Sequence, residues 1–144
     1  MNNTLLLGLL GALCWGIAPV FGKLGLRDIH PVDGLVARTI VTMSFVLAWI
    51  VGAGRASRLA EIAPKDWLYL GIEAFLATLA GDLFYYLALK WGTAGGAAVA
   101  LSVSPVFTVW VSSLLLHESY TWTQMIGALL VAAGILLVAV GGDV

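Results

Sequence analysis

The chain has 144 residues, of which 61% are hydrophobic and only 10% are charged. An ordinary soluble domain carries about 25% charged residues, so this composition excludes a water-soluble globule. Seven basic residues against eight acidic ones give a formal net charge of -1, which provides no basic surface to hold a nucleic acid. The single cysteine, Cys14, excludes an intrachain disulfide framework and a cysteine metal site. We therefore expect neither a metal nor a cofactor.

Apolar blocks of about twenty residues alternate with short polar segments along the sequence. A helix of this length crosses the roughly 30 Å hydrocarbon core of a bilayer, and it satisfies its own backbone hydrogen bonds there. The pattern predicts an all-α integral membrane protein with five transmembrane helices in one compact bundle, as a single domain over residues 1–144. The five predicted helices cover residues 5–21, 35–51, 67–89, 94–116 and 122–140.

The polar segments between these blocks supply helix boundaries. Pro31 is placed to begin the second helix, and Thr121 with Gln124 three residues later forms a capping box for the fifth. Because the connections are short, consecutive helices are expected to be antiparallel. No basic residue precedes the first apolar block, which favours a retained helix over a cleaved signal peptide.

The positive charges of the loops do not select one membrane orientation. Three basic residues fall on each side of the membrane: Arg55, Arg58 and Lys65 on one, and Lys23, Arg27 and Lys90 on the other. Cytoplasmic loops normally carry an excess of Lys and Arg, so this balance permits insertion in both orientations. Two copies can then pair as an inverted repeat. A fixed orientation with a weak signal is the alternative.

Three charged residues lie inside the apolar blocks, where a charge costs about 3 kcal/mol even on the gentler insertion scale. Asp82 is the deepest, on the order of 12 Å from the nearer end of its helix. It shares a helical face with Tyr85 and Tyr86, and Arg38 enters the membrane from the same side and can pair with it. We assign these four residues to the substrate path or to coupling, with Glu73 as a secondary candidate. An ion pair that only stabilises the bundle is the alternative interpretation.

The fourth block contributes a second group of candidates. Ser104 and Thr108 belong to a ridge of small and hydroxylated residues at four-residue spacing, beside Pro105. The ridge either lines a cavity or bonds its hydroxyls to its own backbone. Trp15 and Trp110 lie deep in their blocks, where they either line the substrate path or fill the core.

Several short segments carry a family resemblance, and they are spread over nearly the whole chain: Lys23 after residues 15–19, Arg38, and residues 85–90, 101–108, 116–118 and 124–127. Together they resemble an EamA domain of the drug/metabolite transporter superfamily. The resemblance implies a secondary transporter of small metabolites or drugs in a bacterial or archaeal cell membrane, built from two five-helix units in inverted orientation. Since this chain supplies one unit, it implies a homodimer or a second five-helix subunit.

The sequence therefore predicts a transporter that is not an enzyme and that moves a small-molecule substrate by alternating access within the lipid bilayer. The alternative is a non-transporting membrane scaffold or accessory subunit, in which the same charges only hold the bundle together. A four-helix small multidrug carrier is disfavoured by the helix count and by the lack of an acidic residue in the first block. An intramembrane enzyme is disfavoured because His30 and His117 lie at opposite ends, and no nucleophile, base and orienting residue converge in the sequence.

Overall fold

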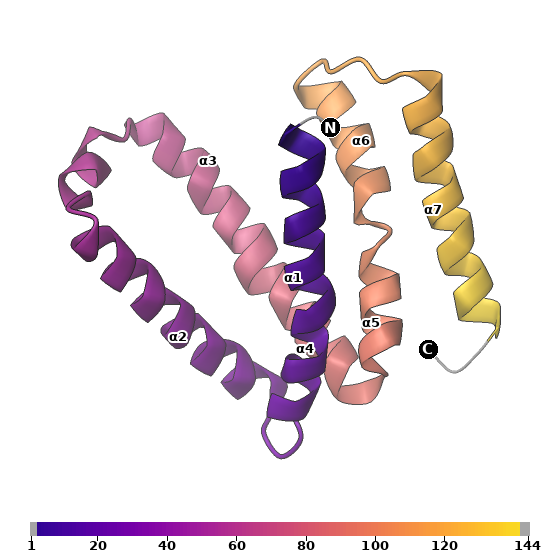
Figure 1. Cartoon of the computed structure of the whole chain (residues 1–144), viewed down its shortest axis with the longest axis horizontal. Coiled ribbons are helices and arrows are strands. Elements are labelled where there is room, and N and C mark those ends of the chain that lie inside the picture. The colour runs from indigo at the N-terminus through magenta and orange to yellow at the C-terminus, as the bar shows by residue number, and fades with distance from the viewer. Residues whose placement is uncertain (1–2, 142–144) are drawn as a thin grey trace. The chain divides into compact units, whose positions relative to one another are not determined.

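The computed structural model describes residues 3–141, and every regular element within this range is helical. Four helical segments are long and apolar enough to cross a membrane: α1 (Asn3–Gly25), α2 (Pro31–Gly52), residues Pro64–Trp91 and residues Ala94–Leu115. A fifth, α7 (Trp122–Gly141), follows them, and its apolar stretch over Trp122–Ile135 is shorter (Figure 1). These segments coincide with the five predicted blocks. The all-α membrane fold is thereby confirmed.

The predicted helix boundaries are present as hydrogen-bonded caps. Pro31 lies in the first turn of α2, and the ring Nδ1 of the N-cap His30 accepts from the backbone N–H of Val32 at 3.3 Å. Before α7, the Thr121 N–H donates to Gln124 Oε1 at 2.8 Å and the Gln124 N–H donates to Thr121 Oγ1 at 3.4 Å. This reciprocal pair is the capping box expected from the sequence, and it satisfies N–H groups that a helix start otherwise leaves open.

The described chain divides into two compact units, which are considered separately here. One contains residues up to Lys23 together with those from Trp91 onward, and the other is Leu24–Lys90. The single five-helix domain over residues 1–144 remains a prediction.

In the unit Leu24–Lys90, α2 and α3 (Pro64–Ala74) run antiparallel and are joined through the short 3₁₀-helix η1 (Ala56–Glu61) (Figure 1). The third span is not one regular α-helix, because α3 passes into a π-helix, η2 (Phe75–Gly81), before α4 (Asp82–Trp91). A Cβ at Gly81 would lie 2.9 Å from the carbonyl oxygen of Leu76, so glycine permits this wide turn. The span is one helical segment, as the sequence predicts, but part of it has π-helical hydrogen bonding.

Side chains at the α1–α2 connection form a small buried core in this unit. Leu26, Leu35, Tyr86 and Leu89 are all buried there. Gly34 allows the close approach, since a Cβ at this position would lie 2.5 Å from Leu26 Cδ2 and 3.4 Å from Tyr86 Cε2. This core fixes the end of α4 against the start of α2.

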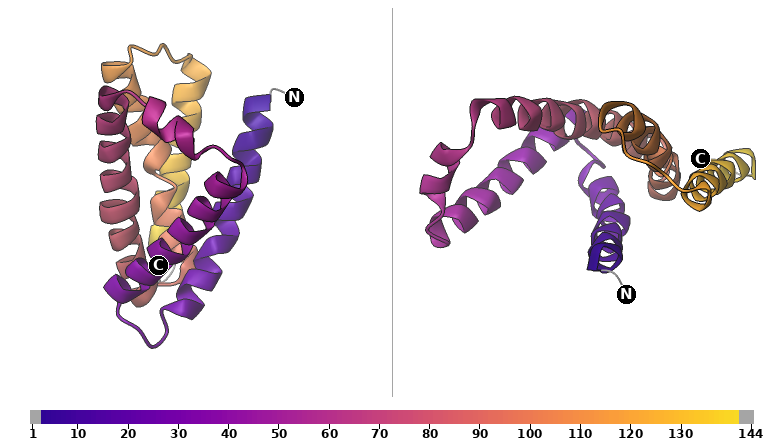
Figure 2. Two further views of the ribbon diagram at one scale, coloured as in Figure 1. Left: turned by 90° about the vertical axis from the view of Figure 1, so that its left-hand side faces the viewer. Right: turned by 90° about the horizontal axis from the view of Figure 1, so that it is seen from above.

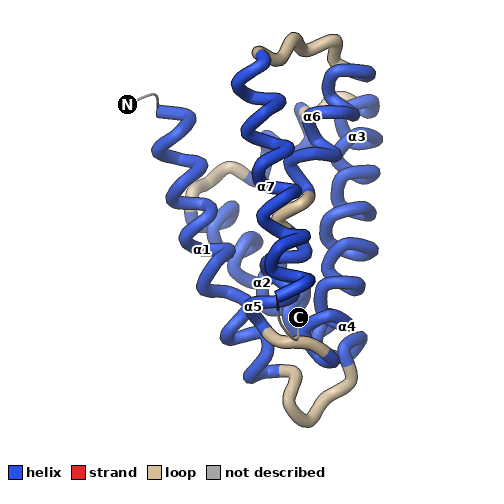
Figure 3. The backbone as a smooth tube through the Cα atoms, turned by 90° about the vertical axis from the view of Figure 1, so that its right-hand side faces the viewer, coloured by secondary structure: helices blue, strands red, loops and turns tan. Residues whose placement is uncertain are grey.

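In the other unit, the fourth span is broken between α5 (Ala94–Leu101) and α6 (Ser104–Leu115), and Figure 3 shows the break as a short loop. Pro105 lies in the first turn of α6 and has no N–H to donate to the carbonyl of Leu101, four residues earlier. α7 runs antiparallel beside both helices (Figures 1 and 2). The break lies before Ser104, so Ser104 and Thr108 remain together on α6.

Candidate functional site

An ion pair joins the two deepest opposite charges of the membrane spans. Arg38 on α2 donates from Nη1 to Oδ2 of Asp82, the first residue of α4. The side chain of Asp82 is only 15% exposed, whereas that of Arg38 is 42% exposed. The pairing predicted from the sequence is therefore present. Arg38 is its accessible partner.

The π-helix η2 positions Asp82 for this contact. The backbone N–H of Asp82 donates to the carbonyl of Ala77, five residues earlier, which is the hydrogen-bond spacing of a π turn. Single π turns inside membrane helices shift the direction of every residue that follows, and they occur often at functional sites. Asp82 is the first residue after the wide turn, so the face it presents differs from that of a regular helix.

Two tyrosines complete the cluster on α4. Tyr86, one turn after Asp82, is buried, and the Cζ atom of Arg38 lies 5.9 Å from the centroid of its ring. This separation is at the outer edge of a cation–π contact. The Tyr85 ring lies 6.1 Å from that of Tyr86, with the planes inclined at 51°. Arg38, Asp82, Tyr85 and Tyr86, all predicted from the sequence, are thus brought together.

Lys90, at the end of α4, makes a set of contacts that the sequence did not predict. Its ammonium group donates to the carbonyl oxygens of Leu26, Arg27 and Ile29 at 2.7, 2.9 and 3.1 Å. These bonds hold the α1–α2 connection against the same helix that carries Asp82. The sequence analysis used Lys90 as a loop charge and as part of the family resemblance, without predicting these contacts. The one available signal was its place in the last turn of a helix, where cations are favoured.

The hydroxyl groups of the fourth span bond mostly to their own backbone. Thr108 Oγ1 donates to the carbonyl of Ser104 at 3.1 Å, and Ser102 Oγ donates to that of Val99 at 2.6 Å. Ser104 and Thr108 are exposed in the single chain. Of the two interpretations offered by the sequence, local backbone bonding is the one that describes these hydroxyls. Their place in a substrate path remains a prediction.

The remaining candidates lie on open helix surfaces. Trp15 on α1 and Trp110 on α6 are 69% and 63% exposed, so neither fills a core within the described chain. Glu73 on α3 is exposed as well, and no ion pair to it is seen among residues 3–141. Within the same range, no group of three or more His, Cys, Asp or Glu side chains is gathered closely enough to hold a metal ion.

The fold and this cluster define a multi-pass helical membrane protein with a paired charge inside its spans. The model of the EamA-like transporter family matches residues 2–140, nearly the whole chain. The chain therefore belongs to that family. The family is named for its transporters.

Individual relatives agree with this family. An uncharacterized transporter of a Sinorhizobium species is 33% identical over 132 residues, covering 92% of this chain and 93% of the relative. An uncharacterized protein of Methanocaldococcus jannaschii is 30% identical over 140 residues, covering 97% and 98%. An uncharacterized transporter of Archaeoglobus fulgidus is 28% identical over 142 residues, which are 98% of this chain but 47% of the relative. No solved structure matches the chain closely enough to count as a relative.

Proposed function

We propose that this protein is a secondary transporter that moves a small metabolite or drug across a bacterial or archaeal cell membrane by alternating access. The observation that carries the proposal is the Arg38–Asp82 ion pair, held inside the membrane spans at the end of a π turn. Family membership supports the transporter class. The ion pair supplies a site where charge can change during a transport cycle.

The chemistry of the pair suits such a cycle. While Asp82 is ionised, each charge neutralises the other and the pair can remain in a dehydrated setting. A proton that binds the Asp82 carboxylate removes its charge and releases the Arg38 guanidinium, which is then free to bind a negative or polar group of the solute. Because Arg38 is the more exposed partner, the solute is expected to approach from its side. The Tyr86 ring lies 5.9 Å from the Arg38 Cζ atom, and the Tyr85 ring lies beside that of Tyr86.

We further propose that two five-helix units act together in inverted orientation. The two shorter relatives match this chain over nearly their whole length, whereas the Archaeoglobus relative is about twice as long. A relative of that length has room for two units of this size in one chain. Gly8 on α1 and Gly127 on α7 support association of two units, since a Cβ at either position would meet no atom within 4 Å. The balanced loop charges permit both orientations.

Solute-dependent proton flux into proteoliposomes tests the transporter proposal. Asp82→Asn keeps the shape of the side chain but cannot exchange a proton, so uphill transport should be lost while solute exchange down a gradient is retained. Asp66→Asn, in the first turn of the same span, is the matched control and should transport normally. Full proton-driven uptake by Asp82→Asn would remove it as the coupling site and make Glu73 the next candidate.

The same set of proteins distinguishes transport from a scaffold role. A scaffold should give no flux with any solute. In that case Arg38→Gln should lower the free energy of unfolding by about 2 to 4 kcal/mol, because it leaves the Asp82 carboxylate unpaired. Adding Asp82→Asn to this variant should restore much of the lost free energy. Restored stability with flux absent throughout would favour the scaffold. Flux in the wild type supports the proposed function.

A further inference from the structure

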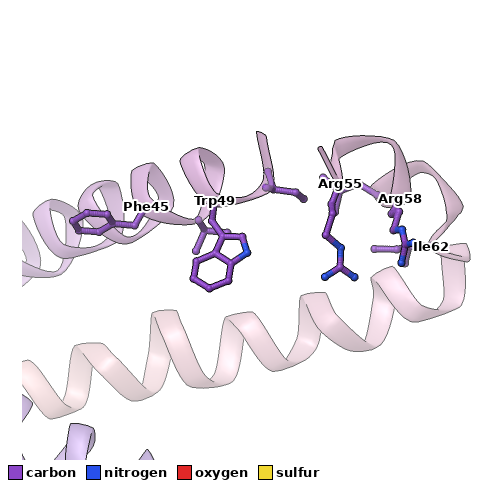
Figure 4. Close-up of a pocket in the computed structure, with 8 residues that line it drawn as sticks. Phe45, Trp49, Arg55, Arg58 and Ile62 are labelled. Carbon is purple, nitrogen blue, oxygen red and sulfur yellow. The ribbon is translucent and has the colours of Figure 1, made fainter. Parts of the chain in front are cut away.

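A second feature of the unit Leu24–Lys90 is a groove of about 610 Å³ formed by the second half of α2 and by η1 (Figure 4). Its volume is within the range of small-ligand sites, roughly 300 to 1,000 Å³. It shares no residue with the Arg38–Asp82 cluster. The lining residues are Phe45, Val46, Trp49, Ile50, Arg55, Arg58, Leu59 and Ile62.

The two arginines lie together at one end of this groove because of the local backbone. Arg55 is the N-cap of η1 and Arg58 lies within it, three residues later. A 3₁₀-helix has about three residues per turn, so side chains at this spacing lie one above the other. Figure 4 shows both side chains extending toward α3, on the same side as the ring of Trp49. No carboxylate among the described residues forms an ion pair with either guanidinium.

The other end of the groove is apolar. Phe45 and Val46 line it along α2, and neither carries a polar side-chain atom. Trp49 lies between Phe45 and Arg55 along the groove (Figure 4) and is 78% exposed near the C-terminal end of a membrane-spanning helix. Exposed tryptophans at such ends lie at the level of the lipid headgroups. A ligand that fits the groove therefore needs an anionic group and an apolar chain, arranged along the membrane normal.

We infer that this groove binds an anionic phospholipid. The phosphate accepts hydrogen bonds from the guanidinium groups of Arg55 and Arg58, and an acyl chain lies against Phe45, Val46 and Ile50. A free phosphate ion would leave the apolar part unused. A zwitterionic lipid brings its own cation, which weakens its attraction to the arginines. Charge complementarity thus selects the anionic lipid, and this inference does not depend on transport activity.

Native mass spectrometry of the full chain in detergent tests the inference. Phosphatidylglycerol and phosphatidylcholine with the same acyl chains are titrated separately, and phosphatidylglycerol should bind more tightly. Arg55→Gln and Arg58→Gln should each lower its affinity about fivefold, since one basic residue near a membrane surface contributes roughly that factor. Arg27→Gln, an exposed arginine in the α1–α2 connection, is the matched control and should leave the affinity unchanged.

Each of the following outcomes would overturn the inference. One is equal binding of the two lipids by the wild type, and another is unchanged phosphatidylglycerol binding in both groove variants. Full competition by inorganic phosphate at matched concentration would show that the site recognises a free anion instead of a lipid. The same spectra report the ratio of monomer to dimer. If the groove variants change only that ratio, the groove is an interface between two copies, and the lipid assignment is wrong.

Discussion

The third and fourth membrane spans both depart from a regular α-helix, but their polar side chains find partners in different places. In the third span, Asp82 follows the π-helix η2 and pairs with Arg38 of another helix, and Lys90 donates to carbonyls of the α1–α2 connection. In the fourth span, Ser102 and Thr108 bond to carbonyls of their own helices beside the break at residues 102–103. The polar side chains of the third span thus bond to other segments of the chain, whereas these hydroxyls of the fourth span bond to nearby backbone.

This difference bears on what each span can do. A polar group within lipid must be satisfied, and a partner on another helix makes the fold depend on that side chain. A partner on the same helix leaves the fold independent of it, so the side chain remains available to a ligand at little cost in stability. Substitutions should therefore destabilise the protein in the third span and leave it folded in the fourth.

Among the substitutions that test this comparison, the largest effect on stability is expected at Lys90→Met, Lys90 being a residue of the third span. Lys90→Met keeps the length and apolar stem of the side chain but removes the three bonds to backbone carbonyls. Loss of charge-assisted hydrogen bonds at a partly buried position should lower the free energy of unfolding by about 2 to 3 kcal/mol. Thermal unfolding in detergent, followed by tryptophan fluorescence, measures it. Lys65→Met, at the exposed start of the same span, should change stability little. Equal losses of unfolding free energy in the two variants would show that the bonds of Lys90 to backbone carbonyls do not stabilise the fold.

Smaller changes in the free energy of unfolding are expected at two glycines of the third span, a loss at one and a gain at the other. Gly81→Ala places a Cβ 2.9 Å from the Leu76 carbonyl oxygen, so the π turn must shift, and a loss of about 1 kcal/mol is expected. At Gly71 nothing lies within 4 Å of an added Cβ. Gly71→Ala should instead gain up to about 1 kcal/mol from helix propensity. Circular dichroism melting of both variants checks the signs, and a gain at position 81 would mean that the wide turn is dispensable.

The features predicted from the sequence are those with a strong or local signal. The four long spans and the shorter fifth helix follow from hydropathy, the start of α2 from Pro31, and the cap of α7 from Thr121 and Gln124. The Arg38–Asp82 pair was predictable because two opposite charges at similar depth have few other partners in lipid.

The features missed by the sequence involve backbone carbonyls. Lys90 bonds to three of them, and η2 is defined by a change from i+4 to i+5 bonding. Every residue has a backbone carbonyl, so the residue types do not indicate which carbonyl will accept a hydrogen bond. The interruption of the fourth span lies at residues 102–103, and Pro105 lies just after it, in the first turn of α6. A periodicity of 100° per residue fails across both irregular stretches.

The smallest effect on stability, and the sharpest test of the comparison, is expected at Thr108. Thr108→Val keeps the shape of the side chain and removes the hydroxyl, whose observed bond is to the carbonyl of Ser104 within α6. Such bonds contribute little to helix stability, so the free energy of unfolding should change by less than about 0.5 kcal/mol. Solute uptake should nevertheless fall if the hydroxyl lines the substrate path, because the variant removes a hydrogen-bonding group from it.

A loss of stability similar to that of Lys90→Met would mean that Thr108 contacts another helix in the assembled protein. Unchanged stability together with unchanged uptake would place the solute path away from this face of α6, leaving the Arg38–Asp82 cluster as the remaining candidate site.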